Sequence, residues 1–161
     1  MRPWGYLGMG VALFFLLTPG FAGQTYLEVS PVGATDRPVL CLPIVPGEAV
    51  GLRFWHSLLG GEVLEVYQIG PDRISLKQAV YESAAQAEFY GRENWVREGG
   101  RVVINERGPE LESLVIRVGK RGKQRLNWRG RDLPLYELVG DGDAVQLMLG
   151  KGDKGCPKKT R

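Results

Sequence analysis

The single histidine of this chain, His56, is one of several side chains capable of chemistry in the stretch GLRFWHSLLGGEVLEVY. Ser57 follows it directly, and Glu65 and Tyr67 come a few residues later. An imidazole can serve as a general base, a metal ligand or a hydrogen-bonding group. Which of these roles is open to His56 depends on the elements that place it.

The residues around Gly60 and Gly61 predict a β-hairpin, because glycine tolerates the positive φ angles of a tight turn. A two-residue loop pairs His56 with Glu65, whereas a four-residue loop pairs His56 with Val63. In both registers His56 and Glu65 share one apolar face, since side chains alternate along a strand. Two alternatives follow. The pair is a buried contact that fixes the register, or it is a polar site at a barrel mouth that binds a ligand or cation.

Catalysis is not expected from these residues. Neighbours along a strand point to opposite faces, so His56 is poorly placed to deprotonate Ser57. There is no G-x-S-x-G elbow and no second histidine. One histidine without H-x-H, HExxH or CxxC spacing predicts no metal centre. We therefore expect a non-enzymatic protein without cofactor or metal, with a hydrolase as the remote alternative.

A second group of candidate residues is basic. Residues 117–131 hold seven basic side chains and no acidic one: Arg117, Lys120, Arg121, Lys123, Arg125, Arg129 and Arg131. With Trp128 among them they resemble a nucleic-acid surface, but the exported character described below argues against that role. A solvated hairpin is favoured, and an anionic membrane surface or an acidic partner is the other alternative.

The N-terminal 22 residues are typical of a signal peptide. Arg2 is followed by an uncharged apolar run and by small residues ending at Ala22. An uncleaved N-terminal membrane anchor is the alternative. Both predict a location in the periplasm or on the outer face of the cytoplasmic membrane. Cys41 and Cys156 suit such an oxidising compartment and could form a disulfide, although two thiols so far apart in sequence need not meet.

The remaining pattern predicts an all-β fold. Period-two alternation, broken by Gly, Pro and Asp, indicates short strands. Their expected positions are 24–30, 38–44, 50–58, 62–69, 73–83, 101–106, 111–118, 124–128, 133–139 and 143–149. This spacing predicts a single antiparallel sandwich or partly closed barrel over residues 24–150. An Ala-rich segment near 84–97 predicts one short helical or irregular piece, and 151–161 reads as a basic flexible tail.

The pattern of Phe54, His56, Ser57, Glu65 and Tyr67 resembles a family of small exported bacterial proteins of unassigned function. Farther along, Leu76, Tyr81 and Ser83 match a strand that ends in serine, and LPLYELVGDGDAVQLML resembles the closing strands of the family. These matches add Ser83 to the candidate polar site of His56, Ser57, Glu65 and Tyr67.

The resemblance implies a role in transport. Genes of this family often lie beside TAXI-type TRAP transporters, which import organic acids and similar solutes with an extracytoplasmic binding protein. It implies an accessory protein whose partner is the TRAP binding protein or permease. One departure stands out: Ala85 and Ala87 occupy positions where the family usually has glycine. A pocket shaped by that glycine-rich run is therefore expected to be altered or lost.

Overall fold

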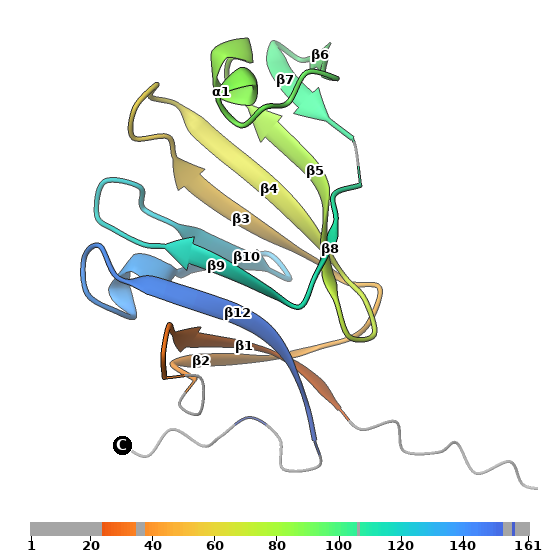
Figure 1. The fold of residues 1–161 in the computed structure, drawn as a ribbon, viewed down its shortest axis with the longest axis vertical. Helices are drawn as coiled ribbons and strands as arrows, with labels where there is room; N and C mark the ends of the chain where they lie inside the picture. Colours follow the sequence, from red (N-terminus) through yellow and green to blue (C-terminus); the bar gives the residue numbers. More distant parts are fainter. Residues whose placement is uncertain (1–23, 35–37, 106, 153–155, 157–161) are drawn as a thin grey trace, which may run out of the picture.

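The computed structural model describes residues 24–34, 38–105, 107–152 and 156. The predicted leader and most of the predicted tail lie outside these residues. In the described part, twelve strands form two antiparallel sheets, with one short α-helix and one 3-10 turn (Figure 1). The prediction of an antiparallel sandwich is confirmed, and the sheets do not close into a barrel.

The smaller sheet has the strand order β2-β1-β12-β9. Its strands are β1 (Thr25–Pro31), β2 (Leu40–Ile44), β9 (Ser113–Arg117) and β12 (Ala144–Lys151). The first and last strands of the chain therefore pair at its centre, with Leu27 opposite Leu149. β9 is left at the edge, with one side free of strand partners in the described fold.

The larger sheet has the order β11-β10-β3-β4-β5-β7-β6, and β8 also pairs with β5. Its central strands are β3 (Ala49–Trp55), β4 (Glu62–Ile69) and β5 (Ile74–Tyr81). The flanking strands are β6 (Val96–Glu98), β7 (Arg101–Ile104), β8 (Glu110–Leu111), β10 (Arg125–Trp128) and β11 (Arg131–Pro134). A register shift interrupts the β4–β5 ladder between Val66 and Tyr67.

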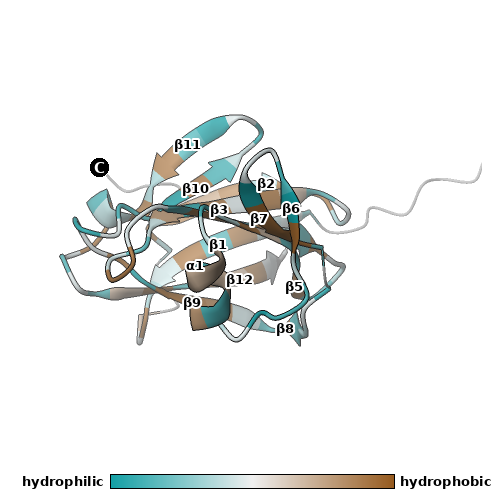
Figure 2. Ribbon diagram, turned by 90° about the horizontal axis from the view of Figure 1, so that it is seen from above, coloured by the Kyte–Doolittle hydropathy of each residue, from teal (hydrophilic) through white to brown (hydrophobic). Residues whose placement is uncertain are grey.

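One continuous hydrophobic core joins the two sheets. Figure 2 shows hydrophobic and hydrophilic residues alternating along the strands, as expected when one face is buried. Val29 and Val145 of the small sheet and Val63 of the large sheet are fully enclosed in this core. Removing such a side chain from water stabilises the fold by about 1.5–3 kcal/mol.

The Ala-rich segment, for which a helix and an irregular piece were both open, begins with a short helix. α1 (Ala84–Phe89) begins at Ser83, whose hydroxyl accepts a hydrogen bond from Gln86 N–H while the Gln86 side chain reaches back to the Ser83 backbone. This capping box satisfies backbone donors that a helix start leaves open. Alanine is the strongest helix former, so the departure from glycine at Ala85 and Ala87 suits a helix here.

The expected strand at 133–139 is wrong. Arg129 and Gly130 both have positive φ and form a two-residue turn, so β11 pairs with β10 from Arg131 onward. After Pro134 the chain turns into the 3-10 helix η1 (Leu135–Glu137), which buries Leu135. The Leu135 N–H donates to the Gln124 carbonyl, so this turn is held by the preceding loop.

The expected solvated hairpin over 117–131 is also wrong. β9 pairs with β12 in the small sheet, while β10 pairs with β3 and β11 in the large sheet. Residues 118–124 therefore cross from one sheet to the other at one end of the sandwich. The basic residues are divided between this crossing loop and two different sheets.

Cys41 of β2 and Cys156, beyond the end of β12, form a disulfide with a Cα–Cα distance of 5.6 Å. It attaches the segment after β12 to an edge strand of the small sheet. Among the described residues, no helix has the length and apolar character needed to cross a membrane.

Candidate functional site

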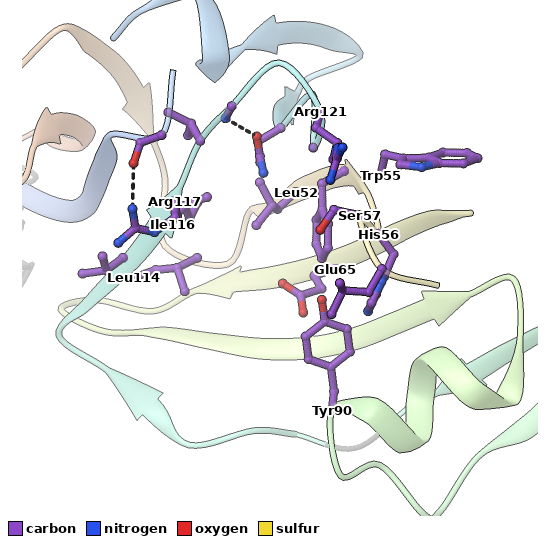
Figure 3. Close-up of a pocket in the computed structure, with 18 of the residues that line it drawn as sticks. Leu52, Trp55, His56, Ser57, Glu65, Tyr90, Leu114, Ile116, Arg117 and Arg121 are labelled. Carbon is purple, nitrogen blue, oxygen red and sulfur yellow. Dashed lines mark hydrogen bonds between the residues drawn. The ribbon is translucent and has the colours of Figure 1, made fainter. Parts of the chain in front are cut away.

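A pocket of about 680 Å³ opens between the edge strand β9 and the β3–β4 part of the large sheet. Figure 3 shows His56, Glu65 and Tyr90 close together, with Leu114, Ile116 and Arg117 of β9 along the other side. The lining residues come from β3 and its following loop, β4, the end of α1, β9 and the crossing loop: Leu52, Phe54, Trp55, His56, Ser57, Leu58, Glu65, Tyr67, Phe89, Tyr90, Leu114, Val115, Ile116, Arg117, Val118, Gly119, Arg121, Gly122, Gln124, Asp141 and Gly142.

The hairpin that carries most of these residues has a longer loop than either predicted register. Phe54 pairs with Val63 and Leu52 pairs with Glu65, so the loop spans residues 56–61. Both expected partners of His56 were therefore wrong. His56 instead closes the loop through its backbone, which donates to Gly61 O and accepts from Gly60 N–H, each at 2.9 Å. Both glycines have positive φ, as the turn chemistry requires.

The His56 side chain is almost fully buried, with 4% of its surface exposed, yet it lines the pocket. Its Nδ1 accepts a 3.1 Å hydrogen bond from the Leu59 N–H. Since Nδ1 acts as acceptor, the proton of the neutral ring lies on Nε2. Within the described structure Nε2 has no hydrogen-bond partner, and the ring packs edge-on against Phe89 and Tyr90, at centroid distances of 4.9 and 5.6 Å.

Glu65 lies beside this ring, but its hydrogen-bond partner is on its own strand. The Tyr67 hydroxyl donates to Glu65 Oε2 at 2.7 Å. Burial raises the pKa of Glu65, whereas the Tyr67 hydrogen bond and the positive charge of Arg92 act to lower it. Burial likewise raises the pKa of Tyr67, with the negative charge of Glu65 adding to the effect. The expected direct His56–Glu65 pair is absent from the hydrogen bonds of the described residues.

Three more polar groups lie near Glu65, and of these only Tyr90 lines the pocket. Burial raises the pKa of Tyr81 to about 12, with the negative charge of Glu65 adding to the effect and the nearby Arg92 side chain acting against it. Tyr90 stacks on Tyr81 at 5.8 Å, and its hydroxyl points toward Glu65 (Figure 3). Arg92 Nε is buried without a partner among the described atoms. Unpaired buried polar atoms are rare and costly. Among the described residues, His56 is the one pocket-lining residue with such an atom, so His56 Nε2 is the group most consistent with a site that takes a ligand.

Four of the five residues of the predicted polar site line this pocket, namely His56, Ser57, Glu65 and Tyr67. Ser57 is exposed, and no hydrogen bond joins it to His56 in the described part of the chain. Ser83 lies elsewhere, because its hydroxyl caps α1. Neither Ala85 nor Ala87 lines the pocket, whereas Phe89 at the end of α1 and its C-cap residue Tyr90 do. The expected alteration of the pocket stays a prediction.

A residue that sequence reasoning missed connects α1 to the hairpin. Gln86 is buried, its Oε1 accepts from the Glu82 and Ser83 N–H groups, and its Nε2 donates to the Gly60 carbonyl. The S-x-x-Q spacing from Ser83 to Gln86 is a capping-box signal that could have located the helix start. The long-range bond to Gly60 has no local signal.

The structure distributes the seven predicted basic residues over different environments. Arg117 and Arg121 line the pocket, and Lys120 and Lys123 flank Arg121 in the crossing loop. Arg125 packs over Tyr136 at 5.9 Å and donates to its hydroxyl. Arg129 lies 4.7 Å over the Trp128 ring and binds both oxygens of Glu48 at 2.7 and 3.0 Å. Arg131 is exposed on β11.

The comparisons with known proteins give one result. A family model described as a domain of unknown function, DUF1850, matches residues 50–135. The chain belongs to the DUF1850 family. No curated protein and no solved structure matches the chain.

The DUF1850 match begins in β3 and ends at the start of η1. Every pocket-lining residue except Asp141 and Gly142 falls inside this range. In contrast, three of the four strands of the small sheet lie outside it. The family-defining segment is thus the part of the chain that builds the pocket.

Proposed function

We propose that this DUF1850 protein is a small-ligand-binding module whose site is the pocket between β9 and the β3–β4 hairpin. The supporting observation is that His56 and Glu65 border a cavity instead of being sealed against each other in the core. The volume of about 680 Å³ is within the range of small-molecule sites.

The walls favour a ligand with an apolar body. Leu52 and Phe54 of β3 face Leu114 and Ile116 of β9 across the cavity. Below them the sandwich core is closed, because the adjoining space that Leu52, Tyr67 and Leu114 also border is only about 10 Å³. An apolar group that enters from the mouth would therefore leave water without displacing core side chains.

The polar end favours a group that both donates and accepts hydrogen bonds. His56 Nε2–H needs an acceptor, whereas a carboxylate such as Glu65 accepts only. A neutral hydroxyl satisfies both, and so does a protonated carboxylic acid. An ammonium group has no lone pair for Nε2–H, and a carboxylate has no proton to donate to Glu65. The matching ligand class is an apolar molecule with a hydroxyl-type head.

Thermal unfolding with matched ligands tests this proposal. The probes are an aliphatic alcohol, the carboxylic acid and the amine of the same chain length. The alcohol should raise Tm most at neutral pH, since a ligand specific for the native state stabilises it by mass action. Leu114→Trp should fill the cavity and remove the shift, whereas Val45→Ser, an exposed residue that does not line the pocket, should keep it. An equal shift in wild type and Leu114→Trp would exclude this pocket.

The resemblance to exported, transporter-associated proteins supports a second, wider proposal. The protein would act outside the cytoplasm as a non-enzymatic accessory of a TRAP-type uptake system, in contact with its binding protein, its permease or its solute. Two observations among the described residues are consistent with a non-enzymatic role: no base is hydrogen-bonded to Ser57, and the Glu65 carboxyl accepts a hydrogen bond from Tyr67.

This wider role has a separate test. The tagged full chain, purified from solubilised cell envelopes, should carry transporter subunits that mass spectrometry can identify. A preparation free of transporter components, from cells shown to express the transporter, would contradict the accessory role and leave ligand binding unaffected.

A further inference from the structure

The exposed hydrophobic side chains of the described structure gather at the mouth of the pocket. Nine large hydrophobic residues are exposed, and five of them line the pocket: Trp55, Leu58, Phe89, Tyr90 and Val115. Leu59, adjacent to Leu58, is the sixth at this end. Scattered exposed hydrophobic residues are ordinary, but a contiguous group around one opening marks a surface that meets an apolar partner.

Two adjacent loops, which we call the mouth loops, carry the most prominent part of this surface. They are residues 55–61 and 118–124, joined where the Trp55 N–H donates to Gly122 O at 2.7 Å. Leu58 is 74% exposed, and Trp55 and Leu59 are 47% and 48% exposed. Figure 3 shows Trp55 and Arg121 at the same rim of the pocket, with the Trp55 ring directed away from the cavity.

The second mouth loop adds positive charge beside these apolar side chains. It contains Lys120, Arg121 and Lys123, all exposed, and Arg117 lies next to it on the pocket rim. Among the described residues, no carboxylate forms a salt bridge with these four cations. The nearby Asp141 accepts the Lys120 backbone N–H and thus occupies the base of the loop.

Two carboxylates, those of Glu62 and Glu82, lie near the first mouth loop. Glu62 is 3.8 Å from Arg53, and the Glu82 carboxylate lies beside Gly61. Glu62 directly follows the turn at Gly60–Gly61 and Glu82 directly follows β5, whereas Leu58 and Leu59 precede the turn. The apolar side chains of the first mouth loop lie next to the cations of the second because the Trp55–Gly122 hydrogen bond joins the two loops.

We infer that the mouth loops dock the protein on an anionic membrane surface, with Trp55, Leu58 and Leu59 inserted at the lipid interface. Tryptophan prefers the headgroup level, where its ring contacts the acyl boundary and its N–H stays polar. Each Lys or Arg near an anionic surface adds about 1 kcal/mol of attraction. Docking would place the pocket opening against the bilayer, from which an apolar ligand could enter without crossing water.

Vesicle sedimentation with the purified chain tests the inference. The expected result is binding to phosphatidylglycerol-rich vesicles, much weaker binding to pure phosphatidylcholine vesicles, and loss of binding at high salt because surface charges are screened. Leu58→Ser with Leu59→Ser, and separately Lys120→Ser with Arg121→Ser, should each reduce the bound fraction at least about tenfold, the equivalent of about 1.4 kcal/mol.

Two matched controls keep the test specific. Val45→Ser removes a hydrophobic residue of comparable exposure that precedes β3, and Arg131→Ser removes a basic residue that does not line the pocket. Both should bind vesicles like wild type. Equal binding to neutral vesicles, no binding to anionic ones, or self-association abolished by the Leu58 and Leu59 substitutions without vesicle binding would overturn the inference. Vesicle binding does not depend on a pocket ligand, so its outcome is separate from the proposed function.

Discussion

The Tyr67 hydroxyl donates a 2.7 Å hydrogen bond to Glu65 Oε2, two residues away on the same face of β4. The polar centre of the pocket is therefore organised within one strand and not across the hairpin. His56 lies beside it with Nδ1 occupied by Leu59 and Nε2 unpaired. The Tyr67–Glu65 hydrogen bond therefore belongs to the fold, whereas His56 Nε2 remains available to a ligand.

The raised pKa of Glu65 predicts how stability depends on pH. Because the folded state holds this proton more tightly than the unfolded state, stability falls as pH rises from the ordinary carboxyl value of 4.5 through the raised folded pKa. Glu65→Gln keeps an acceptor for Tyr67 but removes the charge. It should be more stable than wild type at pH 7, and the advantage should shrink toward pH 4, as measured by urea unfolding over a pH series.

Glu48→Gln is the control of opposite sign. Hydrogen bonds from Arg129 lower the pKa of Glu48, so its contribution is present above the ordinary carboxyl pKa and is lost as pH falls through the folded one. This variant should be slightly less stable than wild type at pH 7 and equal to it in acid. Parallel pH profiles for the two variants would contradict both assignments.

Two substitutions of His56 separate its two nitrogens. The Asn side chain of His56→Asn can place an oxygen near the position of Nδ1 and accept from Leu59, whereas that of His56→Gln reaches the position of Nε2 instead. His56→Asn should be the more stable variant by about 1 kcal/mol, the net worth of the Leu59 hydrogen bond.

For ligand binding we expect the opposite ranking of the two His56 variants, with His56→Gln above His56→Asn. His56→Gln keeps a donor toward the pocket and should retain the alcohol-induced Tm shift, whereas His56→Asn should lose it. Chemical denaturation and thermal shift on the same two proteins check the crossed result. If both properties decline together, Nε2 has no role separate from the fold.

The disulfide should contribute strongly to stability. It closes a loop with a sequence separation of 115 residues, for which chain entropy predicts about 4–5 kcal/mol. The double variant Cys41→Ser, Cys156→Ser should lose stability of this order in guanidinium unfolding. A reducing agent should destabilise wild type equally and leave the double variant unchanged, and stability that is insensitive to both changes would refute the contribution.

Gln86 should matter more than an ordinary capping residue. Gln86→Ala removes the bonds to Glu82 and Ser83 and leaves the Gly60 carbonyl without its side-chain donor. A loss of about 2–3 kcal/mol is expected, compared with about 1 kcal/mol for Ser83→Ala, which removes only the cap. Amide hydrogen exchange should show α1 opening more often in Gln86→Ala, and equal effects of the two variants would refute the α1–hairpin link.

The local pattern of alternating and turn residues was sufficient to predict most of the strands. Nine of the ten expected strands have a counterpart, because alternation and turn residues act over a few positions. The missed strand at 133–139 followed from treating LPLYELV as continuous alternation, although the φ-positive turn at Arg129–Gly130 starts β11 earlier. β6 and β8, with three and two residues, are too short for a periodic signal.

The β3–β4 hairpin could be predicted only in part from its own residues. Alternation correctly placed Phe54, Val63, Glu65 and Tyr67 on one face, because parity survives any shift of the register by two residues. The six-residue loop was not predictable from the glycines alone. It is selected by hydrogen bonds from His56 to Leu59, Gly60 and Gly61 and by the distant contact of Gln86 with Gly60.

The β-rich class, one short helical or irregular piece within 84–97 and the shared face of Glu65 and Tyr67 could all be predicted from the sequence, since each depends on neighbours along the chain. That this face borders a cavity became visible from the packing of the two sheets alone. The opposite wall is β9, about 50 residues further on and in the other sheet, and the mouth includes the end of α1 and the crossing loop. Packing between such distant segments depends on the shapes of two complete sheets, so it cannot be predicted from a local pattern of residues.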